Sequence, residues 1–432
     1  MTIGLLGLIA LLILLVSRVP VAIALILVSF LGTATLLGWS AAFGILQNTP
    51  YSFVSSWTLS AVPMFLLMGF LAFHAGLTRG MYNAAKILLG WIPGGLAISS
   101  IFACSGFAAV CGSSIACAAA MGRVSIPEMV AAGYRPSFAC GVVAAGGTIG
   151  ALIPPSILMI VYGVFAETSI TGVFLGGIGV GLLTAVSYSL IVLLTCLFRP
   201  DIAPRRLRGT QHMDVSSVVG NVAPVIALIL VIFGGLFGGV FTATEAGAVG
   251  ALGTLLICAA TNRLDRTVIS KSLLETLTTC AALFMVGVGA SMFTRFLGIS
   301  GISEAVASAF GSGDLDYVTI MVIIVIIYLA LGTFMEPFGA LLVTLPVVLP
   351  IIEAQGASLI WFGVLVVKLL EIGMITPPVG LNVFVIRSVA REYASTGQIF
   401  RGVAPFILAD LVVVSLLIPF PGLILLFSNI LN

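Results

Sequence analysis

The sequence predicts an all-α protein that crosses a membrane many times and consists of two halves of opposite orientation. Three observations support this prediction: the composition, a repeated double-proline motif and the distribution of basic residues. Of the 432 residues, 60% are hydrophobic and only 7% are charged, whereas roughly a quarter of the residues in a soluble domain are charged. Apolar runs near the length that spans a bilayer, about 20 residues, recur from end to end. The composition therefore leaves no separate soluble domain.

The apolar runs define the expected elements in order. The first run has no positive flank before it and a second run follows at once, so we expect a span rather than a cleaved signal peptide. The expected spans cover residues 3–16, 20–37, 61–76, 137–164, 170–198, 222–238, 243–260, 272–294, 358–390 and 404–428. Two further apolar regions, 92–121 and 318–351, carry small or polar residues at their middle and are expected as re-entrant hairpins. Their tips have to be buried in protein or line a cavity, because irregular backbone is not tolerated against lipid.

Basic residues indicate how the chain is oriented, because Lys and Arg gather on the cytoplasmic side of a membrane. If the N-terminus is outside, 15 of the 17 basic residues lie on the cytoplasmic side, and only Arg295 and Lys368 do not. The loop 199–216, which includes "RPDIAPRRLRG", then lies inside.

A double-proline motif occurs twice, as "IGALIPPSILM" at 149–159 and as "IGMITPPVGLN" at 372–382. Gly150, Pro154, Pro155 and Leu158 recur 223 residues later as Gly373, Pro377, Pro378 and Leu381. Adjacent prolines remove two backbone donors and clash with the preceding turn. We therefore expect broken helices in 137–164 and 358–390.

The order of the elements repeats between the halves. Three spans, an amphipathic connector, a hairpin, a broken helix and a last span occur in residues 1–210 and again in 211–432. Five crossings in each half turn the second half upside down, which is an inverted-topology repeat of the kind found in secondary transporters.

The broken helices and hairpin tips are the candidate binding elements. A break leaves free carbonyls, which suit a hard cation such as sodium or a proton, and free N–H groups, which suit an anion. The nearby polar side chains are Ser105, Ser113, Ser114 and Thr333 at the tips, and Thr148, Ser156, Thr376 and Asn382 at the breaks. Oxygen ligands of this kind suit a hard ion. The alternative is that these hydroxyls only bond across packed helices.

Four ionisable side chains lie in or near the expected membrane segments. Lys368 and Glu371 are three residues apart, and we expect a structural ion pair near the outer interface, with Lys368 reaching toward water. Glu336 lies at the second hairpin tip, where we favour a functional role. Glu245 follows two threonines in a first helical turn, which indicates helix capping. The seven cysteines are expected as buried free thiols, and the two histidines lack partners that would suggest chemistry.

Several segments resemble the large membrane subunit of the tripartite ATP-independent periplasmic (TRAP) transporters, the DctM-like family. They lie in both halves of the chain and are specific when taken together. They are "AVPMFLLMGFLAFHAGL", "GFAAVCGSSIACAAAMG", "PEMVAAGYRPSFACGVVAAGGTIGALIPPSI", "TATEAGAVGAL", "GTFMEPFGALLVTLPVVLPII" and "EIGMITPPVGLNVFVI".

The resemblance implies a sodium-coupled importer of an organic anion, with a carboxylate as the expected class, in the bacterial inner membrane. Its hairpins and broken helices would move against a scaffold by an elevator mechanism. It also implies two partners: a small membrane subunit of about four helices, expected as a separate chain, and an extracytoplasmic solute-binding protein. Nucleic acid binding and enzymatic catalysis are not expected.

The resemblance also implies site residues. One sodium site would involve Ser105, Ser113, Ser114, Gly147 and Gly150, and the other Gly332, Thr333, Gly373, Thr376 and Pro377. The substrate site would involve Ser156, Pro155, Glu336, Pro378 and Asn382. Cys111 and Cys117 stand where the family has Ser and Thr, and Glu336 where Asp is more usual. Because thiols are poor sodium ligands, the two cysteines put the first sodium site in question.

Three alternatives stay open at this point. A membrane-embedded enzyme would need a nucleophile with a base or metal ligands, and the sequence has neither an HExxH nor a GxSxG motif. A purely structural subunit would leave the broken helices without a use. A stand-alone sodium or proton carboxylate symporter of related architecture is the closest alternative.

The charge distribution makes a topological prediction. Single-cysteine labelling in intact cells should place both termini outside the cytoplasm and the loop 199–216 inside. Labelling of that loop from the outside would contradict the whole assignment of two inverted halves.

Overall fold

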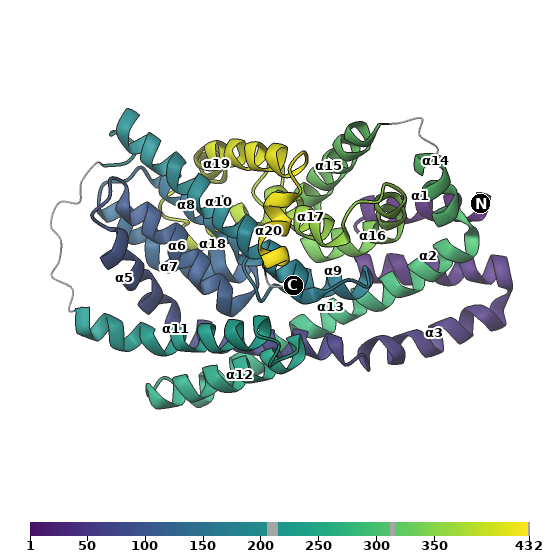
Figure 1. Cartoon of the computed structure of the whole chain (residues 1–432), viewed down its shortest axis with the longest axis horizontal. Coiled ribbons are helices and arrows are strands. Elements are labelled where there is room, and N and C mark those ends of the chain that lie inside the picture. The colour runs from purple at the N-terminus through teal and green to yellow at the C-terminus, as the bar shows by residue number, and fades with distance from the viewer. Residues whose placement is uncertain (205–214, 312–315, 431–432) are drawn as a thin grey trace.

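The computed structural model describes residues 1–204, 215–311 and 316–430, and these contain helices and no strand (Figure 1). The helices of the first half are α1 (Thr2–Val16), α2 (Val21–Leu37), α3 (Trp39–Val54), η1 (Thr58–Ser60), α4 (Ala61–His74), α5 (Leu77–Leu89), α6 (Gly95–Cys111), α7 (Ser114–Ala131), α8 (Pro136–Thr148), η2 (Ile149–Ala151), α9 (Ile157–Phe165) and α10 (Ile170–Phe198). Those of the second half are α11 (Val215–Phe237), α12 (Ala243–Ala260), α13 (Arg266–Ser300), α14 (Ile302–Gly311), α15 (Tyr317–Phe334), α16 (Pro337–Ala354), α17 (Leu359–Gly373), α18 (Leu381–Val389), α19 (Thr396–Leu417) and α20 (Gly422–Ile430).

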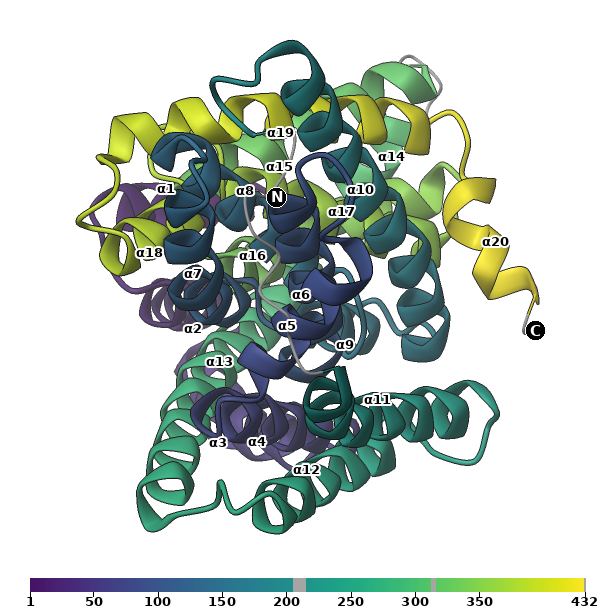
Figure 2. The same ribbon diagram turned by 90° about the vertical axis from the view of Figure 1, so that its left-hand side faces the viewer.

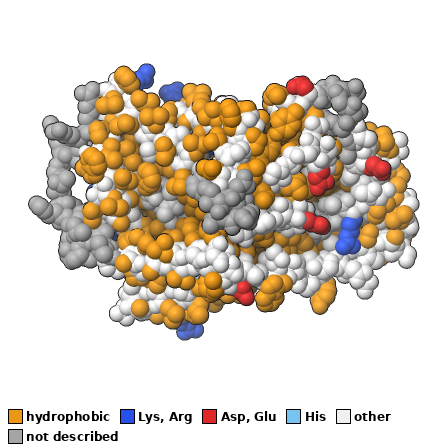
Figure 3. Space-filling view, in the orientation of Figure 1, with side chains coloured by type: hydrophobic (Ala, Val, Ile, Leu, Met, Phe, Trp, Pro, Cys, Tyr) orange, Lys and Arg blue, Asp and Glu red, His pale blue; other side chains and the backbone are white. Residues whose placement is uncertain are grey.

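The surface and the helix lengths identify a membrane protein. In the described part of the chain, six helices are long and apolar enough to cross a membrane, or seven if α3 and the segment Thr58–His74 count as one span bent by 58°. Large apolar side chains are exposed along most helices. They cover much of the face shown in Figure 3, where charged side chains are sparse. Such a surface is stable in contact with lipid rather than with water.

The helices form two groups. Helices α3, α4, α11, α12 and α13 lie along one side of the molecule (Figure 2), where α12 packs on α4 and α11, and α13 packs on α2 and α4. The hairpins and broken helices form the other group, in which α7 packs on α8, and α15 and α16 pack on α17. Contacts from α18 to α7 and from α17 to α9 join the two halves of the chain within this second group.

The two predicted broken helices and the two predicted hairpins are present. The first broken helix stops after α8 and η2 and resumes at α9, and the second stops after α17 and resumes at α18. The Pro154–Pro155 and Pro377–Pro378 peptide bonds within the breaks are cis. In the hairpins, α6 and α7 meet at residues 112–113, and α15 and α16 meet at residues 335–336. The prolines therefore interrupt the helices where the sequence predicted.

The expected span 61–76 is present as α4, but two other expected spans were wrong in extent and one helix was not expected. Helix α3, which begins at Trp39, was missed, and the expected span 272–294 is part of the 35-residue helix α13. Both were missed because polar residues interrupt the hydrophobicity, although packing against the neighbouring helices still stabilises a helix there. The expected span 404–428 is two helices, since Pro419 and Pro421 end α19 and the chain restarts as α20.

The predicted Lys368–Glu371 ion pair at an interface was also wrong. Lys368 is fully buried, and its Nζ donates to Asp410 Oδ1 at 2.5 Å and to Thr184 Oγ1 at 3.0 Å. The Tyr188 hydroxyl donates to the other oxygen of Asp410 at 2.6 Å. Lys368 therefore joins α17 to α10 and α19 inside the protein, because α19 offers a buried carboxylate that no local spacing rule reveals.

This network predicts a large effect on stability. Asp410→Asn keeps the shape but leaves the Lys368 ammonium without its buried counter-ion, which costs about 3–5 kcal/mol. The midpoint of thermal unfolding in detergent should fall strongly. The double variant Lys368→Met/Asp410→Leu should recover much of the loss, because both charges are then gone. Glu353→Gln on the exposed end of α16 is the control, and an Asp410→Asn protein as stable as this control would contradict the prediction.

Candidate functional site

The first hairpin tip lies directly against the first helix break. A Cβ atom added at Gly112, which has φ +59°, would lie 2.3 Å from the carbonyl oxygen of Pro155. A Cβ added at Gly150 would lie 3.0 Å from the carbonyl oxygen of Ser113. Only glycine at the tip allows this approach, since any side chain would collide with backbone. The contacts bring Ser113 and Gly150 of the predicted first sodium site together, and Pro155 of the predicted substrate site lies beside the same tip.

The second hairpin makes the corresponding contact with the second broken helix. A Cβ added at Gly373 would lie 2.4 Å from the Cα of Gly332. The backbones of α15 and α17 therefore touch at this point. Thr333 and Thr376 lie next to the contact in sequence, and their hydroxyls donate to carbonyl oxygens of their own helices, Ala330 at 2.7 Å and Ile372 at 2.7 Å. Their hydroxyl oxygens keep lone pairs that can accept or coordinate.

A side-chain contact connects the two halves. The Ser114 hydroxyl, at the start of α7, donates to Glu371 Oε1 on α17 at 3.1 Å. Ser114 and Glu371 are both buried. The first hairpin tip is thereby tied to the second broken helix, two residues before Gly373.

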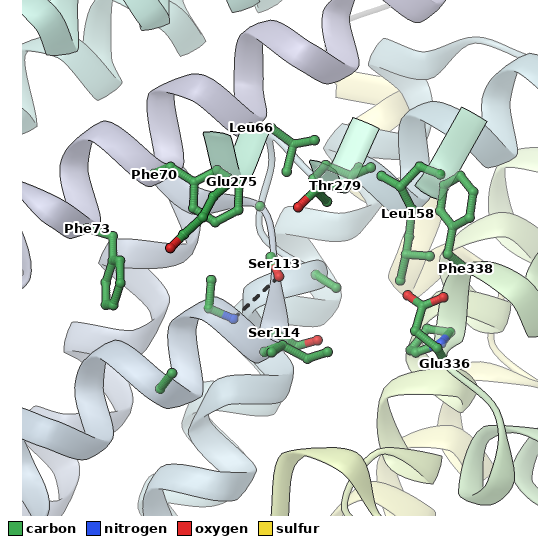
Figure 4. Close-up of a pocket in the computed structure, with 18 of the residues that line it drawn as sticks. Leu66, Phe70, Phe73, Ser113, Ser114, Leu158, Glu275, Thr279, Glu336 and Phe338 are labelled. Atoms are coloured by element: carbon green, nitrogen blue, oxygen red, sulfur yellow. Dashed lines mark hydrogen bonds between the residues drawn. The ribbon is translucent and has the colours of Figure 1, made fainter. Parts of the chain in front are cut away.

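A cavity of about 420 Å³ lies where these elements meet the other group of helices (Figure 4). Residues of the tips and breaks line one side: Gly112, Ser113, Ser114, Ala151, Ile157, Leu158, Glu336, Pro337, Phe338 and Met374. Residues of α4 and α13 line the other: Leu66, Phe70, Phe73, Glu275, Thr279 and Leu283. Arg123 of α7 also lines it. The wall is largely apolar with a few polar groups, as in most small-molecule sites.

Three helix N-termini meet at this cavity, those of α7, α9 and α16. Ser113 caps α7 by accepting a hydrogen bond from the Ala116 N–H at 3.4 Å. Ser156 caps α9. Glu336 caps α16, where its Oε2 accepts from the Gly339 N–H at 3.1 Å. Each N-terminus carries a partial positive charge, and at α16 the capping carboxylate offsets it.

Other predicted residues lie apart from this cavity. Ser105 is in the middle of α6, where its hydroxyl donates to the Ile101 carbonyl at 3.0 Å, so its placement at the hairpin tip was wrong. The tip is Gly112, seven residues later, where the chain reverses. Gly147 packs against Ala118 of α7. Pro377 and Pro378 are exposed, and neither lines the cavity.

Asn382 is the polar residue that the second break leaves unsatisfied. Its backbone N–H donates to the Met374 carbonyl at 3.0 Å, which bridges the break. Its side chain is fully buried, and neither Nδ2 nor Oδ1 has a partner among the described residues. A buried amide without partners costs free energy, so this position suits a polar ligand.

The two cysteines near the first site point at carbonyl groups. The Cys111 thiol lies 3.5 Å from the Ser113 carbonyl oxygen, and the Cys117 thiol lies 3.5 Å from the Cys104 carbonyl oxygen. All cysteines are buried and free, as predicted.

Sequence reasoning missed the part of the cavity wall that α4, α7 and α13 supply. In the sequence, Arg123 was used only as one of the basic residues that indicate the orientation in the membrane. In the structure it lines the cavity, and its guanidinium lies 5.7 Å from the centre of the Phe73 ring. His74 was expected to have no relevant partner, but its Nε2 lies 3.1 Å from Glu275 Oε2. His212 lies outside the described residues. No spacing rule joins these side chains, because the helices meet only in the folded chain.

Comparison with known families matches residues 8–423 to the DctM component of the tripartite ATP-independent periplasmic transporters. The chain belongs to the DctM family. It is therefore a component of a transport system, not an enzyme.

Individual relatives agree with this assignment. The chain is 34% identical to the C4-dicarboxylate TRAP transporter large permease protein DctM of Vibrio cholerae over 397 residues, 86% of each chain. It is 31% identical to the ectoine/5-hydroxyectoine large permease protein UehC of Ruegeria pomeroyi over 423 residues, 97% of each. Identity to the isethionate TRAP transporter permease protein DctMQ of Oleidesulfovibrio alaskensis is 34% over 419 residues, 96% of this chain and 65% of that relative. The relatives thus differ in the solute for which they are named.

The fold is also similar to a solved transporter structure. The crystal structure of the Alcanivorax borkumensis YdaH transporter matches with a TM-score of 0.67 at 16% identity, covering 89% of each chain. At this identity the likeness shows the fold alone.

Proposed function

We propose that this DctM-family chain imports an organic anion, coupled to the sodium gradient, and binds the anion in the cavity between the two groups of helices. The observation that carries the proposal is the meeting of the α7 and α9 N-termini, both capped by serines, at one cavity of about 420 Å³; at the third N-terminus there, that of α16, the Glu336 carboxylate offsets the positive charge. Free N–H groups and aligned dipoles attract anions. Arg123 adds a guanidinium to the same cavity, and a guanidinium can hold a carboxylate through two parallel hydrogen bonds. A carboxylate is therefore the expected substrate class.

Sodium is the proposed coupling ion. The contact between Gly332 and Gly373 brings two backbone segments together, and Thr333 and Thr376 follow these glycines closely in sequence. Oxygen ligands without fixed charge suit a hard monovalent cation. The first cluster, around Ser113, Ser114 and Gly150, offers a similar set.

The proposed mechanism is of the elevator type within an inverted repeat. The cavity has one wall from the hairpins and breaks and the other from α4 and α13. If the group of hairpins and broken helices slides against the group that contains α4 and α13, a solute held at the hairpin tips crosses the membrane while its contacts with the tips are kept. The matching order of hairpin and broken helix in the two halves supports this assignment.

The proposed location is the bacterial inner membrane, with two partners: a small membrane subunit of about four helices and an extracytoplasmic solute-binding protein. The membership of the tripartite family supports both.

Uptake should depend on the partners and on sodium. Liposomes with this chain alone should show little uptake of labelled solute. Liposomes that also contain the small subunit, supplied with the binding protein from the same gene neighbourhood and its ligand, should take up solute only with an inward sodium gradient. Robust uptake by the chain alone would support the stand-alone symporter instead.

The second ion site can be tested at Thr376. Thr376→Val keeps the volume but removes the hydroxyl. The lost contact is worth about 1–3 kcal/mol, or roughly 5- to 150-fold in affinity. The half-saturating sodium concentration for uptake should rise by that factor.

Thr278→Val is the matched control for this test. The Thr278 hydroxyl also donates to the carbonyl four residues earlier, at 2.8 Å, but on an exposed face of α13. Its sodium response should stay as in the unsubstituted chain. If Thr376→Val and Thr333→Val both behaved like this control, the second ion site as proposed would be wrong.

A further inference from the structure

Glu371 is a fully buried acidic side chain to which the described residues give one hydrogen bond and no ion pair. Its Oε1 accepts the hydrogen bond from the Ser114 hydroxyl at 3.1 Å. Its Oε2 is also inaccessible to solvent and has no hydrogen-bond partner among the residues described. An ionised carboxylate buried in this way is costly unless a positive charge accompanies it.

The nearest cation does not fill this role. Lys368 lies one helical turn before Glu371, but its ammonium is held by Asp410 and Thr184. Asp410 is further satisfied by Tyr188, so the lysine and the aspartate form a closed neutral pair. The other charged side chains that act on Glu371 are Glu336 and Asp410, both acidic. An ionised Glu371 would therefore carry a negative charge that these residues do not neutralise, between the first hairpin tip and the second broken helix.

The position of this charge connects the two proposed ion clusters. Ser114 belongs to the first cluster, and Gly373, two residues after Glu371 on α17, belongs to the second. We propose that Glu371 is a charged ligand of a coupling sodium ion, which binds through Oε2 while Oε1 stays bonded to Ser114. The inference rests on the proposed sodium coupling and adds a carboxylate to ligand sets that otherwise consist of hydroxyls and carbonyls.

A bound ion at this position would do more than balance the charge. The carboxylate on α17 already holds the start of α7 through Ser114. A sodium ion on the same carboxylate strengthens this link, so ion occupancy in one half would be sensed by the hairpin tip of the other half. The hairpin tip also lines the solute cavity, which places the ion and the solute on the same element.

The test is sodium-dependent thermal stability of the purified chain, which does not depend on transport. Unfolding midpoints are measured by intrinsic fluorescence in sodium chloride and in choline chloride at equal ionic strength. A ligand that binds only the folded state raises the midpoint as its concentration rises. The unsubstituted chain should show a sodium-specific rise.

Glu371→Gln should change both parts of this result. Without sodium the variant should unfold at a higher temperature than the unsubstituted chain, because the uncompensated charge is gone. The sodium concentration for half of the maximal shift should rise at least about tenfold, because a charged ligand is lost. Glu353→Gln, the same substitution on an exposed glutamate, should behave like the unsubstituted chain.

The possible outcomes separate this inference from the proposed function. A normal sodium response in Glu371→Gln would overturn the role of Glu371 as a sodium ligand and leave sodium coupling in place. This is also the result expected if the Glu371 carboxyl is protonated. Absence of any sodium-specific shift in the unsubstituted chain would overturn both. If Glu371→Gln did not fold, Glu371→Asp would decide. This substitution shortens the side chain by one methylene group and should also weaken the sodium response. An unchanged response would contradict the proposed role of Glu371 as a sodium ligand.

Discussion

The structure depends on one constraint: backbone polar groups inside a membrane cannot use water as a partner. Two pairs of prolines interrupt helices at α8–α9 and at α17–α18, and each interruption leaves groups that need partners. The protein places a hairpin tip against each break, with glycine at the contact so that backbone meets backbone. The pairing of hairpin with broken helix, the convergence of helix N-termini and the cavity beside them all follow from covering these breaks.

Charge is handled in two different ways within a short stretch of α17. Lys368 is fully compensated by Asp410, Thr184 and the hydroxyl that Tyr188 gives to Asp410, so it holds three helices together. Glu371, one turn later, receives only a serine hydroxyl. Two ionisable residues with the same burial thus differ in whether the described residues satisfy them, and the proposed sodium-binding role of Glu371 rests on this difference.

The sequence predicted the elements that have strong local signals. Adjacent prolines end helices, small residues mark tips, and apolar runs mark helices, so both breaks and both hairpins were predicted. The capping role of Glu245 was also right, since Thr242 and Glu245 form a capping box. The partners of Lys368 and His74 were not predictable, because Asp410 and Glu275 come from helices far away in sequence. Ser105 was misplaced because its distance from the turn depends on where the helix ends.

The two breaks share a motif but not an environment. Pro154 and Pro155 are buried, whereas Pro377 and Pro378 are exposed. An ion bound at the first break as proposed would be enclosed by buried residues, whereas one at the second break would lie beside exposed prolines. The two proposed sites, although chemically similar, would then differ in how directly an ion reaches them from the surroundings.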